Sequence, residues 1–223
     1  MRSAAESTVR KQPTCEPQAW DPEKFAREQI RGLVRTLFFS SDTRPVRQVI
    51  FSSTDSEIDV SSICKQVGVS LAFQTPASVV VICKRLPSEL EGRDLAADKR
   101  PAESPTRGPV VHQVRKNLWL VNETGPVNAD EPSAGRALDS RLWELRRDFQ
   151  YSIVEGPVAS EFSGVAALGQ AADGVVLVLA AQHTRRAMAR KIKEDLEAAH
   201  ARILGVVLSE RTFPIPAGIY RRL

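Results

Sequence analysis

Residues 49–72 read VIFSSTDSEIDVSSICKQVGVSLA, and this stretch predicts a strand, a polar turn and a helix in that order. Its first three residues are apolar, and the polar turn after them ends at Asp59. Apolar residues then recur at helical spacing as far as Leu71. A strand, a loop and a helix in this order form the layout of a phosphate-binding site, because the free N–H groups of the helix N-terminus face the anion.

The same stretch lacks the residues with which a phosphate loop binds its ligand. Such a loop needs glycines, which let backbone N–H groups approach the phosphates, and a lysine that reaches their terminal oxygens. No glycine occurs from Val49 to Val67, and Val60 stands where the lysine is expected. The sequence therefore predicts a nucleotide-binding fold that has lost its nucleotide site.

Short apolar runs alternate with helical patterns along the rest of the chain. Continuous β-branched runs such as Ser78–Cys83 are typical of strands buried on both faces of a parallel sheet. The alternation predicts an α/β fold, a doubly wound and mostly parallel sheet with helices on both faces. The predicted strands span residues 47–53, 78–83, 117–121, 151–154, 174–180 and 202–208, and helices are predicted near 59–74, 137–147 and 162–169.

A further helix is predicted from Asp21, which serves as the N-cap and is followed by Pro22 at the first helical position. Its apolar face is expected to contain Ala26, Ile30, Leu33 and Leu37. A basic stripe on the far side consists of Arg27, Arg31 and Arg35. Such a stripe is most often solvated, and the alternative is a docking surface for an acidic partner or a second subunit.

The last predicted helix begins after Thr184, which we expect to be its N-cap. Its buried stripe is predicted to contain Met188, Ile192, Leu196 and Ala199. Five cations cover the outer side, and a solvated face is the default interpretation of such a run. These cations are Arg185, Arg186, Arg190, Lys191 and Lys193.

Composition is that of a globular protein: 223 residues, 42% of them hydrophobic and 26% charged, suit one α/β domain. A net charge of +4, with no basic tract interleaved with aromatics, gives little support to nucleic-acid binding.

The three scattered cysteines form neither a disulfide framework nor a metal motif, which favours the reducing cytoplasm. The longest apolar run, 175–181, is too short to cross a bilayer, so a partner would have to bring the protein to a membrane.

Domain boundaries follow from the polar segments. Residues 1–19 are polar, with Pro13 and Pro17, and are expected to be a disordered tail. Residues 20–223 are expected to form a single domain. Within it, residues 87–108 carry three prolines and mixed charge and are predicted to be a mobile loop.

Several short segments have the order and spacing of known motifs. Residues 28–31 with Arg35 are similar to a Glu-x-x-Arg-x-x-Arg helix, with the second arginine one residue late. Residues 55–62, DSEIDVSS, occupy the place of Thr-Pro-Gly-Glu-Gly-Lys-Ser-Thr, and VVVICKRL at 79–86 that of the second Walker motif. FQYSIVEGP at 149–157 is similar to Phe-Asp-Tyr-Val-Ile-Ile-Asp-Thr-Pro. Together these segments resemble the P-loop ATPases of the MinD/ParA-like class, and within it the cytoplasmic domains of bacterial tyrosine kinases that regulate exopolysaccharide synthesis and export.

The resemblance, carried over position by position, implies that most of the active site is missing. Asp59 and Val60 stand for the second glycine and the lysine of the loop. Cys83 and Arg85 stand for two aspartates that would serve magnesium and water activation, and Glu155 is the one acid kept. The C-terminal tyrosine cluster of the kinases is reduced to Tyr220. The vestigial loop comprises Asp55, Ser56, Glu57, Ile58, Asp59, Val60, Ser61 and Ser62.

The charges around this loop are the inverse of those in a phosphate site. Asp55, Glu57 and Asp59 place carboxylates at a helix N-terminus, where they can cap the helix and repel a triphosphate. Each like-charge contact near 4 Å would cost about 1 to 4 kcal/mol. Lys84 and Arg85 follow the neighbouring strand, and we expect one of them within about 8 Å of a loop carboxylate, closing the site.

The leading hypothesis is a non-catalytic regulatory or scaffold protein that needs no cofactor and no metal. The resemblance implies a cytoplasmic assembly for polysaccharide synthesis or export. Its protein partner would be the cytoplasmic tail of a transmembrane chain-length regulator or an active kinase paralogue. Docking or homo-oligomer formation is expected at the first helix. The residues expected to carry that interaction are Arg27, Glu28, Arg31 and Arg35.

Two alternatives remain open. One is a deviant ATPase or tyrosine kinase that binds ATP and magnesium with help from a partner, using Ser61, Ser62 and Glu155. The other is a sensor whose Lys84 and Arg85 bind a different anion. Cys83 lies beside these two cations, which would lower the pKa of a thiol, although a buried strand-end cysteine is the preferred interpretation. A metal site at His112, His183 and His200 is not expected, because their spacing matches no ligand motif.

Overall fold

The computed structural model describes residues 21–40, 44–85, 110–122, 134–161 and 163–210. The predicted tail at 1–19 and the predicted loop at 87–108 lie outside these residues. The helices are α1 (Pro22–Phe38), α2 (Val60–Gln74), α3 (Ala134–Asp148), α4 (Ser163–Ala171) and α5 (Arg186–Ala198), with a short 3-10 helix, η1 (Ala159–Glu161). The strands are β1 (Gln48–Ser53), β2 (Val79–Cys83), β3 (Val110–Arg115), β4 (Leu118–Asn122), β5 (Tyr151–Glu155), β6 (Gly174–Ala180) and β7 (Ile203–Ser209).

Seven strands within the described residues form one sheet with the order β3-β4-β2-β5-β1-β6-β7. Every neighbouring pair is parallel except β3 and β4, which are antiparallel. The predicted fold class, an α/β fold with a doubly wound and mostly parallel sheet, is therefore confirmed. All six predicted strands are found within one residue of their predicted bounds.

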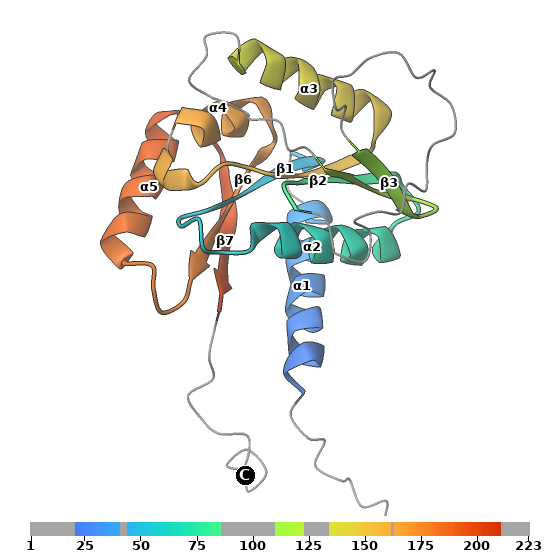
Figure 1. Ribbon diagram of the computed structural model, residues 1–223, viewed down its shortest axis with the longest axis horizontal. Helices are drawn as coiled ribbons and strands as arrows, with labels where there is room; N and C mark the ends of the chain where they lie inside the picture. Colours follow the sequence, from blue (N-terminus) through green and yellow to red (C-terminus); the bar gives the residue numbers. More distant parts are fainter. Residues whose placement is uncertain (1–20, 41–43, 86–109, 123–133, 162, 211–223) are drawn as a thin grey trace, which may run out of the picture.

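Helices cover both faces of this sheet, as predicted (Figure 1). Side chains of α1 and α2 form one hydrophobic cluster with one face of the strands, and those of α3, α4 and α5 form a second cluster on the other. β1 and β2 are buried along their whole length and β6 at every residue but one, because parallel strands covered on both faces must be apolar.

The sequence did not predict β3, the antiparallel edge strand. Its hydrophobicity pattern is the reverse of its burial: Val111 and Val114 are 41% and 42% exposed, whereas His112 is buried. Val111 and Val114 are three positions apart and the register shifts between Gln113 and Arg115, so no regular apolar alternation marks this strand.

Two details of the predicted helices are wrong. Thr184 is not the N-cap of α5, because the helix begins at Arg186 after Arg185 and has no side-chain cap. The Thr184 hydroxyl instead accepts a hydrogen bond from the N–H of Ala180, at 3.0 Å. Met188 is 47% exposed, since the apolar face of α5 reaches the core only from Ile192 onward.

The first half of α1 extends away from the sheet (Figure 1). Asp21 caps the helix as predicted, accepting from the N–H groups of Glu23 and Lys24. Burial is confined to the second half, at Val34, Leu37 and Phe38, while Ala26 is exposed, contrary to prediction. No residue from 22 to 29 is fully buried, so the first half of this helix adds little to the core.

A polar network holds α3 against the end of the sheet where β1 begins. The turn that follows β1 lies at the opposite end. Gln48 is fully buried, and its amide accepts from Arg146 at 2.9 Å and donates to the carbonyl of Leu142 at 3.1 Å. Arg146 also pairs with Asp173 at 2.7 Å, and Asp173 accepts two backbone N–H groups that begin β1. Burying the amide of Gln48 costs little because both of its polar atoms are bonded.

Gly68 allows α2 to approach β2 closely, which generates a stability prediction. A Cβ atom at Gly68 would lie 2.2 Å from Cγ2 of Val81, whereas one at Gly32 on α1 would have nothing within 4 Å. We expect Gly68→Ala to lower the free energy of unfolding by about 1–3 kcal/mol, the usual cost of overpacking. Gly32→Ala, the matched control, should raise it by about 0.5–1 kcal/mol. Urea unfolding measures both, and equal changes in the two variants would contradict the close approach.

Candidate functional site

Residues 54–59 connect the end of β1 to the start of α2, so the vestigial loop at 55–62 spans this turn and the first residues of α2. β1 lies between β5 and β6 at the centre of the sheet, and β2 is the next strand beyond β5. The carboxyl ends of these parallel strands therefore meet around the loop, where ligands bind in such sheets. Glu155 ends β5, and Lys84 and Arg85 follow β2, so the structure brings these predicted residues together.

Three backbone N–H groups of the loop are hydrogen-bonded within it. Asp59 is the N-cap of α2 and accepts from the N–H of Ser62 at 3.1 Å. Asp55 accepts from the N–H of Glu57 at 3.1 Å, and the N–H of Val60 donates to the carbonyl of Ile58 at 2.9 Å. These are the groups that would otherwise be free to bind an anion at a helix N-terminus.

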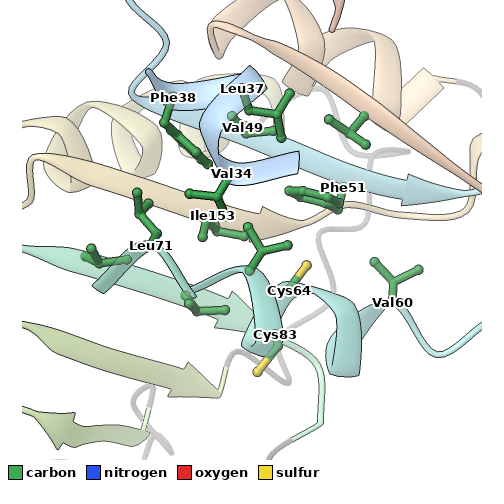
Figure 2. Close-up of a cluster of buried hydrophobic side chains, with 14 of the residues drawn as sticks. Val34, Leu37, Phe38, Val49, Phe51, Val60, Cys64, Leu71, Cys83 and Ile153 are labelled. Carbon is green, nitrogen blue, oxygen red and sulfur yellow. The ribbon is translucent and has the colours of Figure 1, made fainter. Parts of the chain in front are cut away.

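Two apolar side chains of the loop region point into the protein. Ile58 and Val60 are each only 4% exposed and belong to the cluster beneath α1 and α2. Figure 2 shows Val60 beside the start of α2, near Cys64 and Cys83. Val60, where a phosphate loop has lysine, is therefore a core residue. Burying a valine or isoleucine side chain stabilises a protein by about 1.5–3 kcal/mol, so this inward orientation anchors the loop.

Glu155 accepts hydrogen bonds from a residue of α2 and from the residue that follows β2. Its Oε2 accepts the Ser61 hydroxyl and the N–H of Lys84, the latter at 2.9 Å. The Ser61 oxygen in turn accepts from the N–H of Arg85 at 3.3 Å. A serine hydroxyl and an acid that the kinase resemblance assigns to magnesium chemistry thus bond to each other across the site.

Arg85 closes the outside of the loop. Its guanidinium lies 3.7 Å from the carboxylate of Asp59, well within the predicted 8 Å. Both side chains are more than half exposed, so the pair contributes at most a few tenths of a kcal/mol to stability. Its consequence is steric and electrostatic: the cation that could attract an anion already has a carboxylate beside it.

The two described cysteines are inert. Burial raises the pKa of Cys83 to about 11, and nearby Lys65 lowers it less than burial raises it. Burial likewise raises the pKa of Cys64 well above its ordinary value. The preferred interpretation of Cys83 as a buried strand-end cysteine is therefore confirmed, because removing the thiolate from water outweighs a nearby positive charge.

A contact that the sequence did not predict ties the loop to the segment before α5. The hydroxyls of Thr54 and Thr184 are 3.0 Å apart, and the N–H of Thr54 donates to the carbonyl of Val178 at 3.1 Å. Both threonines follow the ends of strands that neighbour each other in the sheet. That shared position is the signal by which the contact could have been found.

The four α1 residues predicted for interaction lie apart from this site. Arg31 pairs with Glu28 at 2.6 Å, and Arg27 with Glu23 at 3.8 Å, all on exposed side chains of the same helix. Among the described residues, no group of histidine, cysteine or acidic side chains could hold a metal. No described helix is long and apolar enough to cross a membrane.

Comparison with known proteins relates the chain to solved structures alone, since no protein-family model and no curated protein matches it. The chimerical protein CapA2B2 is 19% identical with a TM-score of 0.64, over 88% of each chain. The kinase domain of the Escherichia coli tyrosine kinase ETK is 15% identical with a TM-score of 0.62, over 86% of this chain and 79% of that one. The VpsO kinase domain is 18% identical with a TM-score of 0.59, over 85% and 98%. The chain therefore has the fold of tyrosine-kinase domains.

The buried thiols generate a prediction about reactivity. A Cys15→Ser variant retains Cys64 and Cys83, and at pH 8 we expect neither to react with a thiol reagent in the folded protein. With a pKa near 11, Cys83 is thiolate in only about one molecule in a thousand at pH 8, and the fraction rises with pH. Two thiols should titrate once guanidinium unfolds the chain. Fast labelling of the folded variant would contradict the burial.

Proposed function

We propose that this chain is a non-catalytic member of the tyrosine-kinase fold, acting as a regulatory or scaffold protein. The observation that carries the proposal is the burial of Val60, at the position where a phosphate loop presents lysine, together with Ile58 two residues before it. The neighbours of known structure include the kinase domains of the tyrosine kinase ETK and of VpsO, and likeness of fold is the link to exopolysaccharide synthesis or export.

Electrostatics supports the same conclusion. A bound nucleotide would have to displace the Asp59 carboxylate from the N–H of Ser62 and face the carboxylates of Asp55 and Glu57. It would find neither the lysine nor the acidic magnesium ligands of an active site, because Val60, Cys83 and Arg85 stand in those places. Repulsion of about 1–4 kcal/mol per carboxylate would then have nothing to offset it.

The proposed partners are proteins: the cytoplasmic tail of a transmembrane chain-length regulator, or an active kinase paralogue. Helix α1 is the proposed docking surface, because its first half projects from the sheet and the basic stripe of Arg27, Arg31 and Arg35 is exposed along its length. A helix that extends beyond the core gains burial when a partner covers it. In this proposal the protein is cytoplasmic and reaches the membrane through that partner.

The first functional prediction concerns nucleotide binding. Calorimetric titration of about 100 μM protein with ATP or ADP, with and without magnesium, should give no binding heat, which corresponds to a dissociation constant weaker than about 1 mM. The triple variant Asp55→Asn/Glu57→Gln/Asp59→Asn should also fail to bind. Removing the carboxylates abolishes repulsion but leaves Ile58 and Val60 in place, and asparagine still caps a helix.

A tyrosine-kinase domain of this fold is the positive control for the titration. Micromolar binding by the unmodified chain would overturn the proposal and favour the deviant enzyme that uses Ser61 and Glu155. Binding by the triple variant alone would mean that charge, not the buried side chains, closes the site.

The second functional prediction concerns α1. Arg31→Glu should weaken binding to a purified tyrosine-kinase domain of this fold from the same organism about tenfold or more, because a stripe that attracts an acidic surface then repels it. Lys193→Glu is the matched control, since Lys193 is also an exposed helical cation paired with a carboxylate one turn away, at 3.0 Å. Biolayer interferometry measures both. Equal losses would assign the binding to net charge and contradict a surface on α1.

A further inference from the structure

The outer strand β7 presents an open edge. β6 pairs with one side of it in parallel, and no strand within the described residues pairs with the other side. An unpaired edge exposes a row of backbone N–H and C=O groups that another strand can bind, and proteins usually protect such edges with charged residues or proline. Residues 203–209 read ILGVVLS and contain neither.

The direction of the free backbone groups follows from the pairing with β6. The carbonyl of Ser209 accepts from the N–H of Ala181, so the backbone groups of Ser209 face β6. Because these groups alternate along a strand, those of Val207 also face β6, and those of Val206 and Leu208 face outward. The regular stretch from Gly205 to Ser209 therefore presents two outward residues with four free backbone groups.

The side chains of the same two residues are the most exposed of β7. Val206 is 53% exposed and Leu208 is 59% exposed. They pair in register with Leu177 and Leu179 of β6, so they lie on the sheet face that α5 covers. The opposite edge strand, β3, also exposes valines, but it ends in Arg115. β7 thus combines open backbone groups with uncovered apolar side chains.

We propose that β7 pairs with β7 of a second copy of this chain, antiparallel and about a two-fold axis at Val207. In this register Val206 of one copy lies opposite Leu208 of the other, and the same pair recurs across the axis. Outward-facing residues directly opposite each other exchange two hydrogen bonds, so the two pairs form four. The four side chains pack together on one face of a continuous sheet.

The charges of α5 agree with this arrangement. The segment from Arg185 to Lys193 holds five cations and no acid, while Glu194, Asp195 and Glu197 follow. Cations in the first turn of a helix are unfavourable to its dipole, so helix stability does not explain the order. A two-fold axis perpendicular to the sheet keeps both α5 helices on the same face and runs them antiparallel. The basic half of each helix then faces the acidic half of the other.

This interface differs from the proposed docking surface on α1, which covers the other face of the sheet. The proposed dimer is also independent of whether the chain binds a nucleotide. A two-fold dimer would give the chain two α1 surfaces, one on each copy, which is a property that a scaffold can use.

Sedimentation velocity of the full chain from about 1 to 100 μM tests the proposal. The unmodified chain should sediment with twice its mass of 24.6 kDa. Val206→Lys should sediment as a monomer, because it places an ammonium group against Leu208 of the other copy. Leu208→Pro should also be monomeric, since proline removes an outward N–H that β6 does not use. Circular dichroism should confirm that both variants are folded.

Two controls make the result specific. Val111→Lys adds the same charge to the opposite edge strand at a position with 41% exposure, and it should remain a dimer. Arg31→Glu should remain a dimer as well, which separates this interface from α1. A monomeric unmodified chain over the whole concentration range would overturn the proposal, as would a persistent Val206→Lys dimer.

Discussion

The burial of Ile58 and Val60 is the constraint on which the candidate site depends. Both side chains lie in the cluster beneath α1 and α2, and they fix the turn between β1 and the first turn of α2. With the loop anchored from inside, Asp59 caps the helix and the Ser61 hydroxyl meets Glu155. A loop that binds phosphate must leave its backbone donors free, whereas this one bonds the N–H groups of Glu57, Val60 and Ser62 internally.

The polar contacts around the loop and at the opposite end of the sheet follow one rule. Glu155 is bonded to a hydroxyl and a backbone N–H, and the buried amide of Gln48 is bonded to Arg146 and to a carbonyl. Buried polar groups are tolerated when their partners are present, and both ends of the central strands meet that condition. A chain with the fold of tyrosine-kinase domains is thus held at both ends of its central strands by bonded polar groups.

The surfaces that remain open are consistent with a protein that works by association. The first half of α1 projects beyond the core, and β7 ends the sheet with uncovered valine and leucine side chains. These surfaces lie on different elements, and each carries a distinct chemistry, basic on α1 and apolar with free backbone groups on β7. In the two proposals above, one chain would contact a partner through α1 and a second copy through β7 at the same time.

The sequence by itself determined the six main strands, the helices between them and the charge inversion of the loop, because hydrophobic periodicity and local charge are properties of neighbouring residues. It could not reveal that His112 is buried between exposed valines, since β4 and the covering elements decide which face of β3 is inside. The contacts of Ser61 with Glu155 and of Thr54 with Thr184 join residues 94 and 130 positions apart. Only the order of strands in the sheet, a long-range property, brings those residues to one edge, and only packing decided that Ile58 and Val60 point inward.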